Sequence, residues 1–156
     1  MNTRLLLGII ALLFSSSISH SVEVKKTIVD KSTSVNKWTG KHSFTYQWVS
    51  LDKPGALTIE NRFGLLVLNG DQKSDNGDSV HIDGNVVKVS AASFSIYGRI
   101  ESTVAGLHDG KMCKRKGVFD FIKVKKSKKK TVWRLKQKGN PCDPMGLVED
   151  VIEITL

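Results

Sequence analysis

Apolar and polar residues alternate with a period of two along most of this chain, a pattern typical of β-strands that bury one face. The stretch FTYQW places Phe44, Tyr46 and Trp48 on one side, and FSIYGRIESTV keeps the alternation from Phe94 to Val104. No segment shows a comparable helical period. Turn-forming pairs lie between the alternating segments: Pro54-Gly55, Asp83-Gly84, Asp109-Gly110 and Asn140-Pro141. The chain is therefore predicted to be all-β.

About eight antiparallel strands joined by short turns form a meander, and a closed barrel is the arrangement that leaves no open edge. We expect a small lipocalin-like barrel, with a β-sandwich as the alternative. Within the meander, Asp83-Gly84 is expected to turn a tight hairpin and Gly64 to form a bulge or a close contact. The C-terminal stretch VEDVIEITL places Val148, Ile152, Ile154 and Leu156 on one face, which suits a final closing strand.

The N-terminus has the layout of a secretory signal peptide. Arg4 precedes an apolar run of ten residues, Leu5–Phe14, and Ser19 and Ser21 suit a cleavage site before Val22. A run of ten is too short for a bilayer core, which takes about 20 apolar residues. Residues 1–21 are therefore predicted to be a signal peptide and residues 22–156 a single β domain, periplasmic or secreted, without a transmembrane segment.

The chain contains two cysteines, Cys113 and Cys142. In an exported protein an even number of cysteines favours a disulfide. Two free thiols or half of a metal site are the alternatives, although the usual Cys-His spacing of a zinc site is absent. We expect a Cys113–Cys142 disulfide.

The segment between the cysteines is predicted to be a β-hairpin. Placing Phe121 opposite Trp133 and Asp120 opposite Arg134 would bury aromatic rings together and pair opposite charges across the strands. That register puts the turn at Lys126-Ser127-Lys128 and brings the cysteines nearly opposite each other.

Basic residues are concentrated in this hairpin. Between Lys111 and Lys138 the chain has thirteen lysines and arginines against one acid, Asp120, whereas the net charge of the whole chain is +9. Such an uneven distribution creates a positive field that attracts anions. A solvated basic surface without a dedicated ligand is the alternative, because lysines on exposed strands also discourage aggregation.

We therefore expect an exported binding module whose basic hairpin contacts an anionic envelope polymer, lipopolysaccharide or an anionic membrane surface. The predicted anion-binding residues are Lys125, Lys126, Lys128, Lys129, Lys130, Arg134, Lys136 and Lys138. Nucleic acid is a weaker candidate because the aromatic residues are expected in the core.

A proteinaceous inhibitor of a secreted enzyme such as a lysozyme, or a carrier of an apolar ligand, are the alternative functions. An inhibitor could use a loop at Asn69–Asp78 or Asn140–Gly146. No catalytic motif, metal-ligand cluster or cofactor motif is apparent in the sequence, so we expect no enzymatic activity, metal or cofactor.

The C-terminal part resembles a group of small exported bacterial proteins. The resemblance lies in DGKMCKRKGVFDFIKV, VWRLKQKGNPCD and EDVIEITL, with the order G-x-x-C-x-R-x-G-x-F-x-F, then W-R-L and N-P-C; FSIYGRI fits before them. It implies export, the disulfide and a β fold, and implies no activity. The lysine-rich tip is not part of the pattern.

Overall fold

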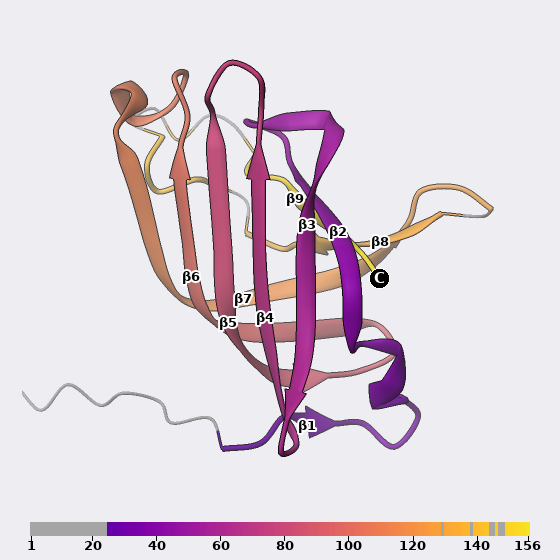
Figure 1. Ribbon diagram of the computed structural model, residues 1–156. Coiled ribbons are helices and arrows are strands. Elements are labelled where there is room, and N and C mark those ends of the chain that lie inside the picture. Colours follow the sequence, from indigo (N-terminus) through magenta and orange to yellow (C-terminus); the bar gives the residue numbers. More distant parts are fainter. Residues whose placement is uncertain (1–24, 129, 138, 144–145, 147–148) are drawn as a thin grey trace, which may run out of the picture.

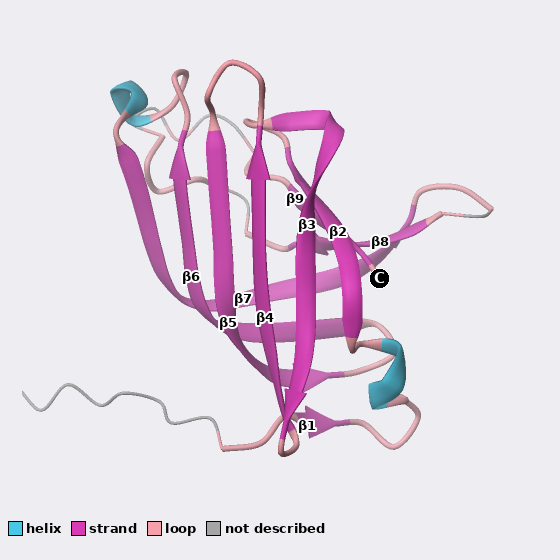
Figure 2. Cartoon of the chain, in the orientation of Figure 1, coloured by secondary structure: helices cyan, strands magenta, loops and turns pink. Residues whose placement is uncertain are grey.

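The structure is a computed structural model that describes residues 25–128, 130–137, 139–143, 146 and 149–156. The predicted signal peptide lies outside these residues. Nine β-strands follow one another, with two short 3-10 helices, η1 (Val35–Lys37) and η2 (His108–Gly110) (Figures 1 and 2). The strands are β1 (Ile28–Val29), β2 (Gly40–Tyr46), β3 (Ser50–Arg62), β4 (Leu65–Lys73), β5 (Ser79–Val89), β6 (Ser93–Thr103), β7 (Met112–Lys125), β8 (Thr131–Leu135) and β9 (Ile152–Thr155).

Strands β2 to β9 form a closed antiparallel barrel. Each pairs with the next along the chain, and β9 pairs with both β8 and β2, which closes the ring. The short β1 lies outside this meander and adds in parallel to the end of β5, with Ile28 opposite Lys88. The predicted all-β barrel and its closure by the C-terminal strand are confirmed, and the sandwich alternative is wrong.

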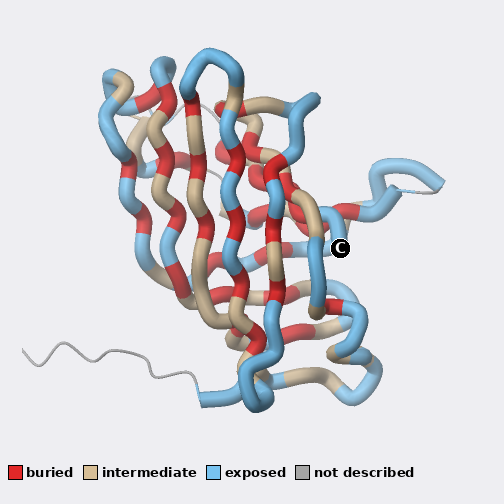
Figure 3. Tube along the Cα trace, viewed as in Figure 1, coloured by how far each residue is buried: buried red, intermediate tan, exposed pale blue. Residues whose placement is uncertain are grey.

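Inward-facing side chains fill the barrel. Buried residues alternate with more exposed ones along most of β4, β6 and β7, as Figure 3 shows. At one end the rings of Phe94 and Phe121 stack with centroids 4.7 Å apart, and Trp38 lies 4.9 Å from Trp133. Burying a large apolar side chain stabilises the fold by about 1.5–3 kcal/mol, so this contiguous core is the main source of stability. Because side chains fill the interior of the barrel, the structure argues against the alternative of a carrier for an apolar ligand.

Two predicted turns are wrong. Pro54-Gly55 lies inside β3 and Asp83-Gly84 inside β5. In both pairs the glycine permits a close approach between strands: a Cβ on Gly55 would lie 2.4 Å from the carbonyl oxygen of Asp71, and one on Gly84 would lie 2.8 Å from the Cα of Gly98. A glycine inside a strand commonly marks such contacts or a tight bend of a barrel.

Gly64 is also placed differently from the prediction. It forms a two-residue turn with Phe63 between β3 and β4, and both residues have positive φ angles, 56° for Phe63 and 92° for Gly64. Two positive φ angles are characteristic of the type I′ turn that matches strand twist. The predicted bulge is therefore a hairpin turn.

Candidate functional site

The β7–β8 hairpin carries Lys125, Lys126, Lys128 and Lys130 at or near its turn, which extends beyond the barrel wall. The turn between the strands is closed by bonds from the amides of Lys126 and Ser127 to the carbonyl oxygen of Lys130, and by a bond from the Lys130 amide to Ser127 Oγ. In Figure 1 this turn projects away from the barrel, at the right. The lysines near its tip are therefore presented to solvent on a hydrogen-bonded arm.

The register of the hairpin differs by two residues from the prediction. Phe121 lies opposite Leu135, and Lys123 lies opposite Trp133. A shift of two keeps every side chain on its predicted face, so Phe121, Trp133 and Leu135 are still buried. Above the outer face of Trp133, the Nζ of Lys123 lies 5.7 Å from the ring centroid, within the range of a cation–π contact.

The predicted pairing of Asp120 with Arg134 is wrong. Asp120 instead accepts a hydrogen bond from Ser95 Oγ on β6, 2.5 Å away. Arg134 lies opposite Glu153 of β9 and donates to it from Nε at 3.0 Å and from Nη2 at 2.7 Å. Strand β8 has two neighbouring strands, β7 and β9, and the acidic partner of Arg134 lies on β9 instead of β7.

Glu153 forms ion pairs with two of the predicted anion-binding residues. Lys126 Nζ lies 2.8 Å from its second carboxylate oxygen, and the glutamate side chain is only 10% exposed. Burial by itself raises the pKa of this carboxyl, but hydrogen bonds and charge from Lys126 and Arg134 outweigh burial and hold the pKa below its ordinary value. Lys126 and Arg134 are thus partly neutralised within the protein.

The other predicted residues fall into two groups. Lys125, Lys128, Lys130 and Lys136 are exposed, and within the described part of the chain they form no ion pair. Lys129 and Lys138 lie outside the described residues. The structure therefore brings Lys125, Lys128 and Lys130 together at the tip, with Lys136 further along at the end of β8.

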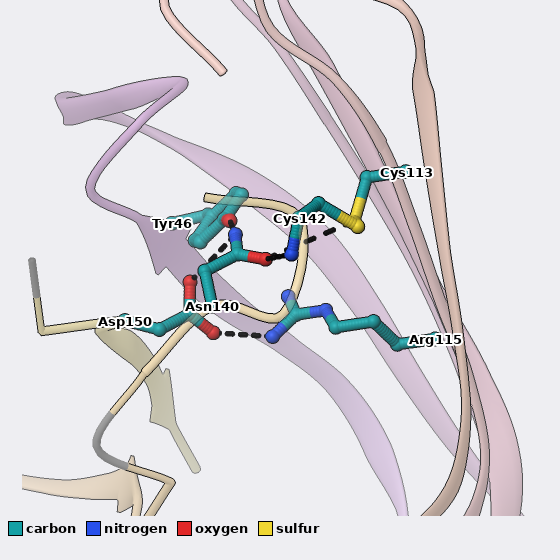
Figure 4. Close-up of a disulfide and its surroundings, with 6 residues drawn as sticks. All are labelled: Tyr46, Cys113, Arg115, Asn140, Cys142 and Asp150. Atoms are coloured by element: carbon teal, nitrogen blue, oxygen red, sulfur yellow. Dashed lines mark hydrogen bonds and ion pairs between the residues drawn. A yellow bond between two sulfur atoms is a disulfide. The ribbon is translucent and has the colours of Figure 1, made fainter. Parts of the chain in front are cut away.

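The disulfide belongs to a buried polar network that tethers the segment after β8 to β7. Cys113 on β7 is bonded to Cys142, with Cα atoms 5.9 Å apart, which confirms the predicted bridge. The Asn140 amide donates to Tyr46 Oη at 2.7 Å and accepts from the Cys142 amide at 2.9 Å. These contacts are drawn in Figure 4.

An ion pair completes the network. Arg115 Nη1 bonds the carboxylate of Asp150, and both side chains are at least 97% buried. Burial raises the pKa of the Tyr46 hydroxyl strongly, and the nearby Asp150 charge adds to the rise. The residues lie on β2, on β7 and in the segment between β8 and β9, so the network seals a part of the wall that no strand covers.

A family model named the PM1083 family matches residues 25–156. The chain belongs to the PM1083 family. A protein of Pasteurella multocida (strain Pm70), whose name is "Uncharacterized protein PM1083", is 37% identical over 119 residues, which cover 76% of this chain and 73% of that protein. No solved structure matches.

Membership of the PM1083 family agrees with the broader part of the predicted resemblance, a bacterial family with no activity attached to its name. The detailed motif order stays a prediction. Five residues from the stretches that carried the resemblance nevertheless meet in the buried network: Cys113, Arg115, Asn140, Cys142 and Asp150. Their spacing was the one sequence signal that could have predicted this cluster.

Three further observations concern this PM1083-family chain. Among the described residues no group of three or more histidine, cysteine or acidic side chains is placed to hold a metal ion. No helix in the described ranges is long and apolar enough to span a membrane. Asn140, which begins one loop considered for enzyme inhibition, is 3% exposed and is committed to the network, so it is not free to enter an active-site cleft.

Proposed function

We propose that this protein is an exported binding module that holds an anionic partner at the tip of its β7–β8 hairpin. The partner class is an anionic polymer or surface of the cell envelope, such as lipopolysaccharide. The proposal involves no catalytic step.

One observation carries the proposal: Lys125, Lys128 and Lys130 are exposed together on an arm that projects from the barrel, without acidic partners among the described residues. Lysines that only solubilised a sheet edge would not need a separate projecting support. Like charges held close together repel one another, and an arriving anion relieves that repulsion.

Export is part of the proposal. The family model begins at residue 25, just after the predicted cleavage site, and a Cys113–Cys142 bridge is typical of oxidising compartments outside the cytoplasm.

The test is retention on a heparin column over a salt gradient, followed by binding to lipopolysaccharide. One variant replaces the tip residues Lys125, Lys126, Lys128, Lys129 and Lys130 with serine. A matched control variant replaces five exposed lysines elsewhere with serine: Lys26, Lys31, Lys37, Lys41 and Lys88. Both variants lose the same formal charge, and the tip variant also loses the Lys126–Glu153 ion pair.

We expect the tip variant to elute at clearly lower salt than the control variant, because polyanion affinity depends on the local number of neutralised charges. If the two variants elute together, net charge alone governs retention, and the hairpin is not a dedicated contact surface.

A further inference from the structure

A hollow of about 560 Å³ lies at the mouth of the barrel, at the root of the β7–β8 hairpin. It is lined by the segment 32–38, by the β5–β6 turn, by the hairpin and by Leu156 after β9. In Figure 2 η1, the lower of the two helices, lies on the same side of the barrel as the hairpin and the C-terminus. Binding pockets usually measure about 300–1,000 Å³, and barrel mouths are a common place for them. This hollow is here called the mouth pocket.

Two buried tryptophans form the floor of the mouth pocket. The rings of Trp38 and Trp133 lie with centroids 4.9 Å apart. The Trp38 ring also packs edge to face against Phe94, with centroids 5.0 Å apart, so the floor is anchored in the core. The tryptophan pair separates the pocket from the filled interior of the barrel and gives the pocket an aromatic base.

Both charged side chains in the lining are basic. Lys37 at the end of η1 and Lys123 on β7 are exposed. Within the described part of the chain, neither forms an ion pair with an acidic side chain or with the terminal carboxylate of Leu156. The Nζ of Lys123 lies 5.7 Å from the ring centroid of Trp133, which holds this charge over the floor. Two positive charges against one carboxylate favour an anionic ligand.

Hydroxyl groups supply the rest of the polar lining. Ser32, Ser34 and Thr131 form no side-chain hydrogen bond with any described residue, and Ser34 precedes η1 without capping it. The hydroxyl of Thr33 is buried and has no partner among the described residues either. Ser90 differs, because its hydroxyl is bonded to Ser93 within the β5–β6 turn. Buried polar groups are normally hydrogen-bonded, so the hydroxyls beside this pocket are groups that a polar ligand can satisfy.

We propose that the mouth pocket binds a phosphorylated sugar. Lys37 and Lys123 would hold the phosphate, for which lysines act as mobile point charges. Serine and threonine hydroxyls both donate and accept hydrogen bonds, as the hydroxyls of a sugar do, so Ser32, Ser34 and Thr131 would pair with the ring substituents. The tryptophan floor would contact the apolar face of the sugar ring. Binding involves no covalent step.

The mouth pocket lies at the root of the hairpin, whereas the proposed polymer contact lies at its tip. A small sugar phosphate would bind in the pocket whether or not the tip holds a polymer. This inference therefore does not depend on the proposed function.

The test follows the indole N–H signals of the ¹⁵N-labelled, disulfide-bonded protein during titration with glucose 1-phosphate. The signals of Trp38 and Trp133 should shift and saturate. The signal of Trp48 should not move, because Trp48 follows β2 whereas Trp38 precedes it, and the two lie at opposite ends of that strand. An unchanged Trp48 signal also reports that a variant is folded.

Two partial ligands separate charge from sugar recognition. Glucose lacks the phosphate and should bind about tenfold more weakly or worse, as for lost hydrogen bonds to a charged group. Inorganic phosphate keeps the charge but lacks the sugar hydroxyls, and it should bind about fivefold more weakly or worse, as for a lost neutral hydrogen bond.

Two pairs of lysine substitutions locate the phosphate. Lys37→Gln with Lys123→Gln should weaken binding of glucose 1-phosphate about tenfold, since each exposed charge contact contributes about threefold. Lys41→Gln with Lys73→Gln is the matched control, because these lysines are also exposed but lie outside the lining. The control variant should bind like the natural protein.

The proposal is overturned if glucose 1-phosphate leaves the Trp38 and Trp133 signals unmoved. It is equally overturned if inorganic phosphate binds as tightly as glucose 1-phosphate, or if the two lysine pairs have the same effect. Either result would mean that the pocket is only part of a basic surface.

A phosphorylated core oligosaccharide of lipopolysaccharide, titrated in the same way, distinguishes two sources of the ligand. Tighter binding than that of glucose 1-phosphate would support the pocket and identify an envelope polymer as the source. Weaker or equal binding, with glucose 1-phosphate still bound, would support the pocket and identify a free sugar phosphate.

The two proposals fail separately. The five-lysine tip variant should bind glucose 1-phosphate almost as tightly as the natural protein does. The variant with glutamine at Lys37 and Lys123 should be retained on heparin more strongly than the tip variant. Failure of the pocket can therefore be told from failure of the tip.

Discussion

Gly98 lies at the closest contact between two neighbouring strands. It faces Gly84 across the β5–β6 ladder and Gly117 across the β6–β7 ladder, so three glycines form a row across strands that curve strongly in Figure 1. A Cβ at Gly98 would lie 2.0 Å from the carbonyl oxygen of Asp83 and 2.6 Å from the Cα of Gly84. Both contacts are with backbone, so no side chain can move aside to make room.

Gly98→Ala should therefore lower the free energy of unfolding by about 3 kcal/mol, near the upper end for overpacking. Urea denaturation measures the change. Gly106→Ala is the matched control because nothing lies within 4 Å of its Cβ position. Equal stability of the two variants would show that β5 and β6 are not in close contact at Gly98.

Glu153 makes the stability of the barrel depend on pH. Its folded-state pKa is lower than the ordinary 4.5 because the hydrogen bonds from Lys126 and Arg134 outweigh the opposing effect of burial. A lowered folded-state pKa gives stabilisation that is present above the unfolded value and is lost as the pH falls through the folded value.

Glu153→Gln should accordingly destabilise the protein at pH 7 by about 1 kcal/mol, a typical value for a partly exposed ion pair. The difference from the natural protein should shrink as the pH falls below 4.5, because the natural carboxylate then becomes protonated. Urea unfolding of both proteins from pH 7 to pH 3 tests this. A stability difference that stayed constant from pH 7 to pH 3 would contradict the lowered pKa assigned to Glu153.

At the scale of elements, the segment between β8 and β9 depends on its disulfide. The cysteines are 29 residues apart in sequence, and closing such a loop stabilises a fold by about 3–4 kcal/mol in the chain-entropy model. A Cys113→Ser, Cys142→Ser double variant should lose stability of that order in urea. Reduction of the natural protein should reproduce the loss, whereas the same reductant should leave the double variant unchanged.

Much of the element order could be predicted from sequence because alternation reports which face of a strand is buried. Phe94–Val104 corresponds closely to β6, Ser93–Thr103, and Phe121, Trp133 and Leu135 lie on the expected face. Turns were harder to predict. Asp-Gly is compatible both with a turn and with a close strand contact, and only the neighbouring strand, here the one that carries Gly98, decides between them.

The site was predictable only where it depends on local sequence. The tip lysines follow from a turn between two strands, so their exposure could be predicted. Arg115 was counted among the basic residues between Lys111 and Lys138 but is buried against Asp150, and Arg134 is paired with Glu153. Both acids lie near the C-terminus, and only the closed barrel brings them to β7 and β8.

For the whole molecule, closure depends on β9. Its four residues pair with Ser43–Tyr46 on one side and with Trp133 and Arg134 on the other. Ile152 and Ile154 are fully buried. Deleting Ile152–Leu156 would open two strand edges and remove two core side chains, each of which costs about 2–5 kcal/mol when truncated.

That deletion should abolish the near-ultraviolet circular dichroism of the packed aromatic core and allow the dye ANS to bind. Removing Leu156 alone should leave the circular dichroism and the absence of ANS binding as in the natural protein, because that residue lies beyond β9 and is 37% exposed. If the variant without Ile152–Leu156 unfolded cooperatively and bound no ANS, the barrel would close without β9.

Closure by β9 also constrains the order in which the barrel can assemble. Thr155 pairs with Ser43, so one edge of β2 has no partner until β9 docks. Cys113 and Cys142 both precede β9 in the chain, so their disulfide can form while the sheet is still open. An unpaired strand edge is an aggregation hazard. The folding protein is therefore most vulnerable in the interval before β9 docks, and a chaperone that covers β2 would act until that moment.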